Sequence, residues 1–365
     1  MKVLVAPLDW GLGHATRCVP VVKEFLRQGA EVELAVVRAN ADFFREVFPE
    51  LRQRIAPGYN IVYPKHGFNM GLWLLKNSAH LNTVMRYEHR YAEEMVERHG
   101  YDVLFSDNRF GFYSQKAYSV YMTHQRRIAF PPALSVFEGI GIRWHNSIMK
   151  KFDEVWVPDE KLYPGYAGAL SHVELASSPV KFIGPLSRFD DVESPGVPAG
   201  EKRYKIVAVV SGVEPARSQF EKKLRKLLAE IPGRHLMILG KPQSGRKFWT
   251  EGNIEICNHL PTDAFASAVK SAEWVVSRGG YSTVMDMAYL GAKCIFVPTS
   301  GQYEQVYLGR FLASSGYAVE IPFASLSVES LLEAIKLRVS LPMPTGHALL
   351  HEAIEKLSRN RVSKI

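Results

Sequence analysis

MKVLVAPLDWGLGHATRC, residues 1–18 of the chain, joins a short apolar run to a turn with two glycines and then to a helical pattern. The apolar run, 2–7, is typical of a buried strand, and the helical pattern extends from about residue 15 to residue 28. Gly29 would end that helix, because glycine is favoured just past a helix terminus. A strand that leads through a small-residue turn into an amphipathic helix predicts a parallel α/β layer.

The same alternation of strand and helix continues along the chain. Helical patterns cover 77–99 and 215–231, and they separate short β-branched runs bounded by polar or turn residues. Such runs predict the buried strands of a doubly wound parallel sheet. The runs are 31–37, 101–106, 119–123 and 154–158, and then 204–210, 235–240, 254–257, 274–277, 294–298 and 318–321.

The length of 365 residues suggests two domains, since one domain usually takes about 100–200 residues. The stretch 182–200, FIGPLSRFDDVESPGVPAG, is rich in proline and glycine and has the composition of a linker. We therefore expect a first domain over 1–185, a linker over 186–200 and a second domain over 201–345. A basic helix over 346–365 packs on the second domain or crosses back to the first.

Composition narrows the class of protein. The hydrophobic fraction of 47% and charged fraction of 22% are ordinary for a globular protein, and the net charge of +8 favours anionic partners or reflects a solvated basic surface. No nucleic-acid-binding motif accompanies the charge, so nucleic acid is not an expected partner. No signal peptide or transmembrane run is evident, and three widely spaced cysteines indicate buried thiols, which predicts a cytoplasmic protein.

The opening turn, DWGLGHATR (9–17), is the first candidate site. Gly11 and Gly13 permit close approach of a ligand to the backbone, and the start of the helix presents free N–H groups to an anion. His14 stands at this turn and can accept a proton near neutral pH. Thr16 occupies the place of the third glycine of a dinucleotide-binding motif, which weakens that interpretation. The alternative is a tight turn with a hydrogen-bonded histidine.

The second candidate site lies in the second half of the chain. Small and polar residues follow the predicted strands there, where helix N-termini and side-chain donors suit a diphosphate. An acid one turn into the helix is within reach of ribose hydroxyls, and a polar pair after the next strand can bind the hydroxyls of a sugar. These residues are Ser211 and Gly212, then Arg278, Gly279, Gly280, Ser282 and Thr283, then Asp286, and finally Glu304 and Gln305.

The arrangement resembles the GT-B glycosyltransferases, in particular the family 28-like group that contains the peptidoglycan N-acetylglucosaminyltransferase and the galactolipid synthases. The resemblance rests on the glycine turn with a histidine, on SRGGYSTVMD (277–286), on a strand ending FVP and on the polar pair beyond it. It implies two Rossmann-like, doubly wound parallel-sheet domains that face each other across a cleft and close about the linker. It also implies a diphosphate loop at Arg278, Gly279, Gly280 and Thr283, a ribose-binding acid at Asp286, a sugar-binding pair at Glu304 and Gln305, a loop at Ser211 and Gly212, and a nucleotide base against His259 and Leu260.

The function that the resemblance implies is inverting, metal-independent transfer of a sugar. The donor is a nucleoside diphosphate sugar, UDP-linked and carrying N-acetylglucosamine or another hexose, and the acceptor is a lipid-linked molecule or a glycan. His14, or alternatively Asp107, takes the proton from the acceptor hydroxyl. We expect no metal and no cofactor, because the His, Cys, Asp and Glu residues lack the spacing of a metal cage.

Acceptor-side candidates come from the first domain. They follow two predicted strands and include the opening turn: Gly11, Gly13, Asn108, Arg109, His124 and Gln125. The stretch HGFNMGLWLL (66–75) is either a lipid-facing loop or core. With the basic charge, it suggests peripheral association with the anionic inner face of the cell membrane.

A second resemblance keeps another reaction open. GLGHATRC (11–18) is similar to the G-x-G-H-x-x-R-C turn of the UDP-sugar hydrolase of pseudaminic acid synthesis, where the histidine activates water. Hydrolysis of a UDP-sugar is therefore the main alternative. A UDP-sugar epimerase and a non-catalytic sugar-nucleotide binder are the remaining ones.

Overall fold

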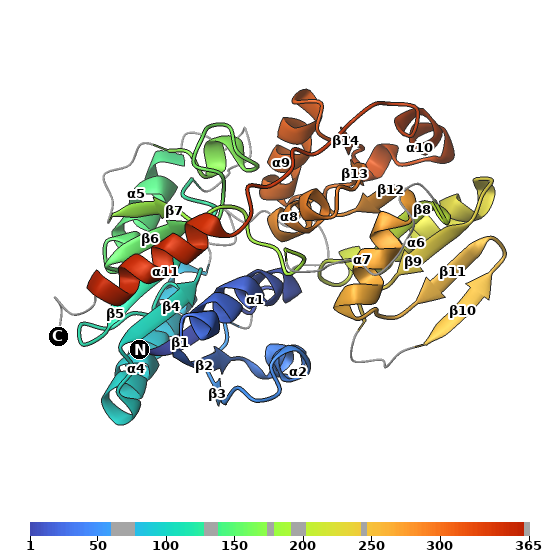
Figure 1. Ribbon diagram of the computed structural model, residues 1–365. Helices are drawn as coiled ribbons and strands as arrows, with labels where there is room; N and C mark the ends of the chain where they lie inside the picture. The colour runs from blue at the N-terminus through green and yellow to red at the C-terminus, as the bar shows by residue number, and fades with distance from the viewer. Residues whose placement is uncertain (60–76, 128–137, 174–178, 191–201, 242–246, 361–365) are drawn as a thin grey trace. The chain divides into compact units, whose positions relative to one another are not determined.

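The computed structural model describes residues 1–59, 77–127, 138–173, 179–190, 202–241 and 247–360 (Figure 1). The described residues fall into two compact units. One contains the residues up to Ser187 together with those from Thr345 onward, and the other contains Arg188 to Pro344. The stretches 66–75 and 191–200 of the sequence analysis lie outside the described residues.

The first unit is built on a parallel sheet of seven strands. Their order is β3-β2-β1-β4-β5-β6-β7, which places β1 and β4 in the middle of the sheet with both faces covered. Apolar residues therefore occupy most positions of β1 and β4, as expected for a parallel sheet. The strands are β1 (Lys2–Pro7), β2 (Glu31–Val36), β3 (Gln53–Ile55), β4 (Val103–Asp107), β5 (Tyr118–Met122), β6 (Glu154–Val157) and β7 (Val180–Phe182).

Helices cover this sheet, and one of them comes from the far end of the chain. Helix α11 (Ala348–Asn360) places Leu350 and Ile354 in the same core cluster as Val22 and Phe25 of α1 (Leu12–Arg27). Figure 1 shows α1 in blue and α11 in red side by side. The C-terminal helix thus belongs to the first unit. The other helices of this unit are α2 (Arg38–Val47), α4 (Ser78–His99), α5 (Glu138–Met149) and the short 3-10 helix η2 (Gly168–Leu170).

The second unit repeats the plan with one change. Its seven strands have the order β10-β11-β9-β8-β12-β13-β14, and all pair in parallel except β10, which is antiparallel to β11. The strands are β8 (Tyr204–Val209), β9 (His235–Ile238), β10 (Phe248–Glu251), β11 (Ile254–Cys257), β12 (Ala272–Ser277), β13 (Cys294–Phe296) and β14 (Val319–Glu320). The helices are α6 (Ala216–Glu230), α7 (Thr262–Lys270), α8 (Tyr281–Tyr289), α9 (Tyr303–Ser314), η4 (Phe323–Ser325) and α10 (Val328–Ala334).

The two parallel α/β layers confirm the predicted fold class, and the main local correction concerns the opening turn. Helix α1 begins at Leu12, about one turn earlier than expected. Gly11 precedes it with a φ of 93°, a conformation that side chains with a Cβ rarely adopt. The bend covers 9–11 and only Gly11 within it has a positive φ, so Gly13 and His14 lie in the first turn of the helix.

The packing of α11 on α1 is testable by substitution. Ile354 is fully buried, so Ile354→Ala should lower the free energy of unfolding by about 2–5 kcal/mol through lost burial and a residual cavity. Urea unfolding followed by circular dichroism measures this change. The neighbouring exposed residue supplies the control, because Glu355→Ala should stay within about 0.5 kcal/mol of the parent. Equal midpoints for the two variants would rule out the packing described for α11.

Candidate functional site

The carboxyl edge of the first sheet gathers the polar residues of the opening turn. Strand β1 pairs in parallel with β4, with Pro7 opposite Asp107, and Asp107 lies opposite Met122 of β5. The ends of β1, β4 and β5 therefore coincide, and α1 starts at the same edge. Ligands of open α/β sheets bind at this edge.

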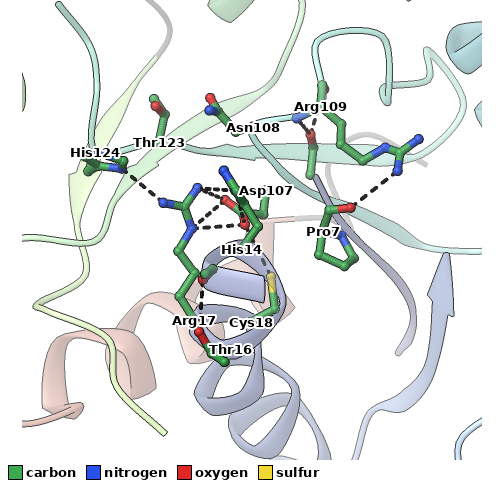
Figure 2. A network of polar contacts seen from close by, with 12 residues as sticks. Pro7, His14, Thr16, Arg17, Cys18, Asp107, Asn108, Arg109, Thr123 and His124 are labelled. Carbon is green, nitrogen blue, oxygen red and sulfur yellow. Dashed lines mark hydrogen bonds and ion pairs between the residues drawn. The ribbon is translucent and has the colours of Figure 1, made fainter. Parts of the chain in front are cut away.

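A buried carboxylate connects these elements, as Figure 2 shows. Asp107 is fully buried, and its Oδ2 lies 3.0 Å from Nδ1 of His14. Arg17, which is 4% exposed, donates from Nε to both oxygens of Asp107 at 2.9 and 3.0 Å, and from Nη2 to Oδ1. Its Nη1 lies 3.0 Å from Nδ1 of His124. One guanidinium thus links α1 to the ends of β4 and β5.

Nδ1 of His14 has two competing neighbours. The carboxylate of Asp107 requires a proton on this nitrogen, whereas Nη2 of Arg17, at 2.8 Å, requires its lone pair. Burial and the charge of Arg17 lower the pKa of His14 from its usual 6.5, although Asp107 acts in the opposite direction. His14 is consequently neutral near pH 7, which is the state that a general base needs.

Asp107 has a different electrostatic role from His14. Its pKa falls to about 2 because the opposing charges of Arg17 and His14 and their hydrogen bonds outweigh the effect of burial. The carboxylate is ionised throughout the neutral range and is already engaged by both neighbours. This geometry suits a partner of the histidine better than a second proton acceptor.

The sequence analysis did not assign a role to Arg17, although the residue is part of the quoted GLGHATRC stretch. A signal was present, because residues 14 and 17 are three apart and share a face once both lie on a helix. The sequence analysis placed the start of this helix at about residue 15, so His14 was not expected to share a helix face with Arg17.

Of the acceptor-side candidates, five lie at the carboxyl edge and one, Arg109, lies in the interior. Asn108 has a φ of 60° and accepts a hydrogen bond at Oδ1 from the Tyr121 hydroxyl at 2.7 Å, and Gly11 and Gly13 are exposed at the same edge. His124 is buried beside Arg17, and Gln125 is partly exposed after it. Arg109, in contrast, is fully buried.

The placement of Arg109 corrects the expectation that it faces an acceptor. Its Nε donates to Glu88 of α4 at 2.5 Å, Nη1 donates to the Pro7 carbonyl at 3.3 Å, and Nη2 donates to the Pro57 carbonyl. Glu88 is buried as well and also accepts from the Tyr59 hydroxyl and from the Gly111 N–H, both at 2.7 Å. Arg109 thus holds Pro7, Pro57 and α4 together through these hydrogen bonds. The buried acid Glu88 compensates its buried charge.

The carboxyl edge of the second sheet gathers the donor candidates. Ser277 of β12 lies opposite Val209 of β8 and Phe296 of β13, so the loops that follow these strands are neighbours. Gly212 has a φ of 110°, and Gly280 precedes α8, with open space where a Cβ would stand in both cases. The structure therefore brings these residues to one edge: Ser211, Gly212, Gly279, Gly280, Ser282, Thr283 and Asp286.

His259 and Leu260 follow β11 at the same edge, two strands away from β8. Glu304 and Gln305 lie in the first turn of α9. Gln305 accepts at Oε1 from the Thr299 N–H at 2.9 Å and donates to Gln302, so it fixes the turn before the helix.

Arg278 occupies a different position from the one expected at a diphosphate loop. It is 3% exposed, and its Nη1 donates to the carbonyls of Val297 and Pro298 at 2.9 and 3.0 Å. Its Nη2 donates to the Ala216 carbonyl at 3.3 Å, and the guanidinium stacks 4.1 Å from the Phe220 ring. The side chain thus holds the loops after β8, β12 and β13 together from inside.

Arg278 nevertheless contributes a charge to this edge. Burial alone lowers its pKa to about 10, and no carboxylate among the described residues pairs with it. Its Nε and the Ser277 hydroxyl are buried without a hydrogen-bond partner in the part of the chain that the structure describes. Among the described residues, the edge therefore carries a positive charge that no carboxylate compensates, next to Gly279 and Gly280 in the sequence.

Two features are absent from the described residues. No group of three His, Cys, Asp or Glu side chains within them is placed to hold a metal ion. Over the same residues, no helix combines the length and the apolar character that crossing a membrane requires.

Comparison with known proteins finds a family similarity that covers much of the second unit. Residues 234–345 match the glycosyltransferase family 28 C-terminal domain. An uncharacterised glycosyltransferase of Methanosarcina acetivorans is 24% identical over 340 residues, covering 88% of this chain and 84% of the relative. The chain is a glycosyltransferase related to family 28.

Other similarities of this glycosyltransferase are partial in sequence or confined to the fold. The UDP-N-acetylglucosamine–N-acetylmuramyl-(pentapeptide) pyrophosphoryl-undecaprenol N-acetylglucosamine transferase of Pasteurella multocida is 30% identical over 142 residues, which is 38% of this chain and 40% of that protein. The crystal structure of the spinosyn rhamnosyltransferase SpnG has a TM-score of 0.63 at 16% identity and covers 100% of this chain and 97% of its own. MurG of Acinetobacter baumannii has a TM-score of 0.53 at 14% identity, with 97% and 99% covered. The solved structures are GT-B glycosyltransferases.

The buried pair of Arg17 and Asp107 predicts a loss of stability in the enzyme. Asp107→Asn leaves Arg17 buried without an acid, so the free energy of unfolding in urea at neutral pH should fall by about 3–5 kcal/mol. Asp42→Asn is the control, because it breaks an exposed pair with Arg45 and should cost less than about 1 kcal/mol.

The same pair predicts a pH dependence. The pKa of Asp107 is lowered from 3.8 to about 2, so its ionised form stabilises the fold fully above about pH 4 and loses this effect as the pH falls toward 2. The difference between the parent and Asp107→Asn should shrink over that range. A difference that is constant from neutral pH to pH 2 would contradict the assignment.

Proposed function

We propose that this glycosyltransferase moves a sugar from a UDP-linked donor, bound by the second unit, to an acceptor hydroxyl bound by the first unit, with inversion and without a metal ion. The observation that carries the proposal is the contact between His14 and the buried carboxylate of Asp107 at the carboxyl edge of the first sheet. The resemblance to family 28 supplies the class of donor, and the chemistry of the two edges supports it.

His14 acts in this proposal as the general base. With its proton on Nδ1 and donated to Asp107, the Nε2 atom keeps its lone pair and can accept the proton of the acceptor hydroxyl. Asp107 holds the ring in this tautomer and stabilises the imidazolium that forms, as a buried carboxylate does in other acid–histidine pairs. A base of this kind typically contributes a factor of about 10²–10⁴ in rate.

The edge of the second sheet stabilises the departing diphosphate. The N-terminus of α8, preceded by Gly280, presents free N–H groups and the positive end of a helix dipole. Arg278 adds its buried charge behind the loop, so the developing negative charge meets a positive field that the protein itself supplies. Asp286 and the pair Glu304 and Gln305 are the proposed ligands of ribose and sugar hydroxyls.

The acceptor is proposed from the relatives and from charge. The Pasteurella relative is by name a transferase to a pyrophosphoryl-undecaprenol acceptor, and the net charge of +8 suits an anionic membrane surface. We propose a lipid-linked or glycan acceptor, reached in the cytoplasm by peripheral association with the membrane.

Hydrolysis of the donor is the second candidate. The same His14 and Asp107 pair can deprotonate water, and GLGHATRC resembles the corresponding turn of a UDP-sugar hydrolase. The two reactions differ in whether an acceptor excludes water from the sugar.

A panel of nucleotide sugars, incubated with and without a cell lipid extract, separates these reactions by the release of nucleoside diphosphate. Transfer predicts release that requires the extract and that falls by about 10²–10⁴ in His14→Ala, because the general base is lost. His99→Ala, on α4, is the matched control and should retain the parent rate. Equal release without extract would establish hydrolysis instead, and the absence of release from every donor would refute both reactions.

The proposed base also predicts the pH profile of the reaction. Because the pKa of His14 is lowered, kcat/KM should fall on acidification through a pKa below 6.5. Arg17→Gln removes the neighbouring charge that lowers this pKa, so the acid limb should move to higher pH, whereas Arg17→Lys should move it less. Arg143→Gln, an exposed charge change on α5, is the control. An acid limb that stays in place in Arg17→Gln would count against His14 as the titrating base.

A further inference from the structure

A second arginine at the edge of the first sheet is buried, and no acid among the described residues pairs with it. Arg126 lies four residues beyond the end of β5, in the loop that also carries His124, and it is 5% exposed. Its Nη1 approaches the Ser171 carbonyl at 3.5 Å, the outer limit of a hydrogen bond. Its Nε is buried with no partner among the described residues.

The described groups around Arg126 do not compensate its charge, because they are neutral or already hydrogen-bonded to other partners. Burial is the cause that lowers the pKa of Arg126. Burial and the nearby charge of Arg126 lower the pKa of His145, on α5, to about 4. The carboxylate of the neighbouring loop, Asp159, is occupied by the N–H groups of Glu160, Tyr166 and Ala167 and by the Ser171 hydroxyl.

This arrangement differs from that of the other buried arginines of the first unit. Arg17 faces Asp107 and Arg109 faces Glu88, so each of these charges is compensated inside the unit. A guanidinium that is withdrawn from water and left uncompensated destabilises the fold, which makes a structural role a poor explanation for Arg126. Planar guanidinium groups bind phosphate and carboxylate oxygens through paired N–H groups.

We propose that Arg126 is the receptor for an oxyanion carried by the acceptor, a phosphate or a carboxylate. The proposal rests on the proposed function in so far as the ligand is the acceptor. The location of Arg126 supports the proposal, because His124 lies in the same loop. Nδ1 of His124 is 3.0 Å from Nη1 of Arg17, which also contacts His14 and Asp107. At the same edge, the Tyr121 hydroxyl lies 2.7 Å from Oδ1 of the partly exposed Asn108 and 3.0 Å from Nε2 of the buried His145.

Binding of inorganic pyrophosphate to the full chain, measured by calorimetry with UDP present at saturation, tests this site separately from the donor site. Arg126→Met should weaken pyrophosphate binding by about 10–100-fold, the range of a charge-assisted hydrogen bond, and Arg126→Lys should weaken it less. Acetate titrated at the same ionic strength distinguishes a site for carboxylates from one for phosphates. Arg143→Gln, which removes an exposed charge from α5, should leave the affinity unchanged.

Stability provides a second, independent readout. Removing an uncompensated buried charge should leave the urea midpoint of Arg126→Met unchanged or raise it, because methionine fills a similar volume. Glu174, which lies outside the described residues, is the acid nearest in sequence to Ser171. A lowered midpoint in Arg126→Met that Glu174→Gln reproduces would overturn the proposal in favour of a structural ion pair.

Two further outcomes are decisive. Equal pyrophosphate affinity in the parent and Arg126→Met would also overturn the proposal. A chain that binds no UDP would contradict the proposed donor, while the comparison of the Arg126 variants in pyrophosphate would still decide the anion site.

Discussion

Parallel pairing of the strands determines where the polar groups of this protein lie. In each unit the central strands run in the same direction, so their carboxyl ends lie at one edge, and the loops that follow these parallel strands begin there. Residues that are far apart in the sequence, such as His14 and Asp107, become neighbours because β1 and β4 pair with Pro7 opposite Asp107. The chemistry of both edges depends on this constraint.

Buried guanidinium groups add further connections between the elements that strand pairing brings together. Arg17 joins α1 to the ends of β4 and β5, Arg109 joins β1 to α4, and Arg278 joins three loops of the second unit. Each guanidinium has several N–H donors in one plane, so a single side chain can hold several backbone segments together. The three arginines differ in whether their charge is compensated: Arg17 and Arg109 pair with carboxylates, whereas within the described residues Arg278 contacts carbonyl oxygens and aromatic rings.

The sequence predicted the alternation of strands and helices in both units because apolar periodicity is a local signal. It also placed the donor candidates at strand ends, where the structure has them. It did not predict that the side chains of Arg109 and Arg278 point into the interior. Their partners belong to other elements, and contacts between distant elements produce no periodic pattern in the sequence. The early start of α1 was missed for a local reason: the bend after β1 ends at Gly11, so the second glycine, Gly13, is part of the helix. The antiparallel strand β10 was missed as well, and its residues are mostly exposed at the sheet edge.

The helix that carries His14 packs against the last helix of the chain. Leu350, Ile354 and Leu357 of α11 complete the core around Val22 and Phe25 of α1. During synthesis on the ribosome, all of the second unit therefore emerges before the first unit can close its core. Helix α1 can therefore complete its packing only after α11 has been synthesised, so its assembly is a late step in the production of the protein.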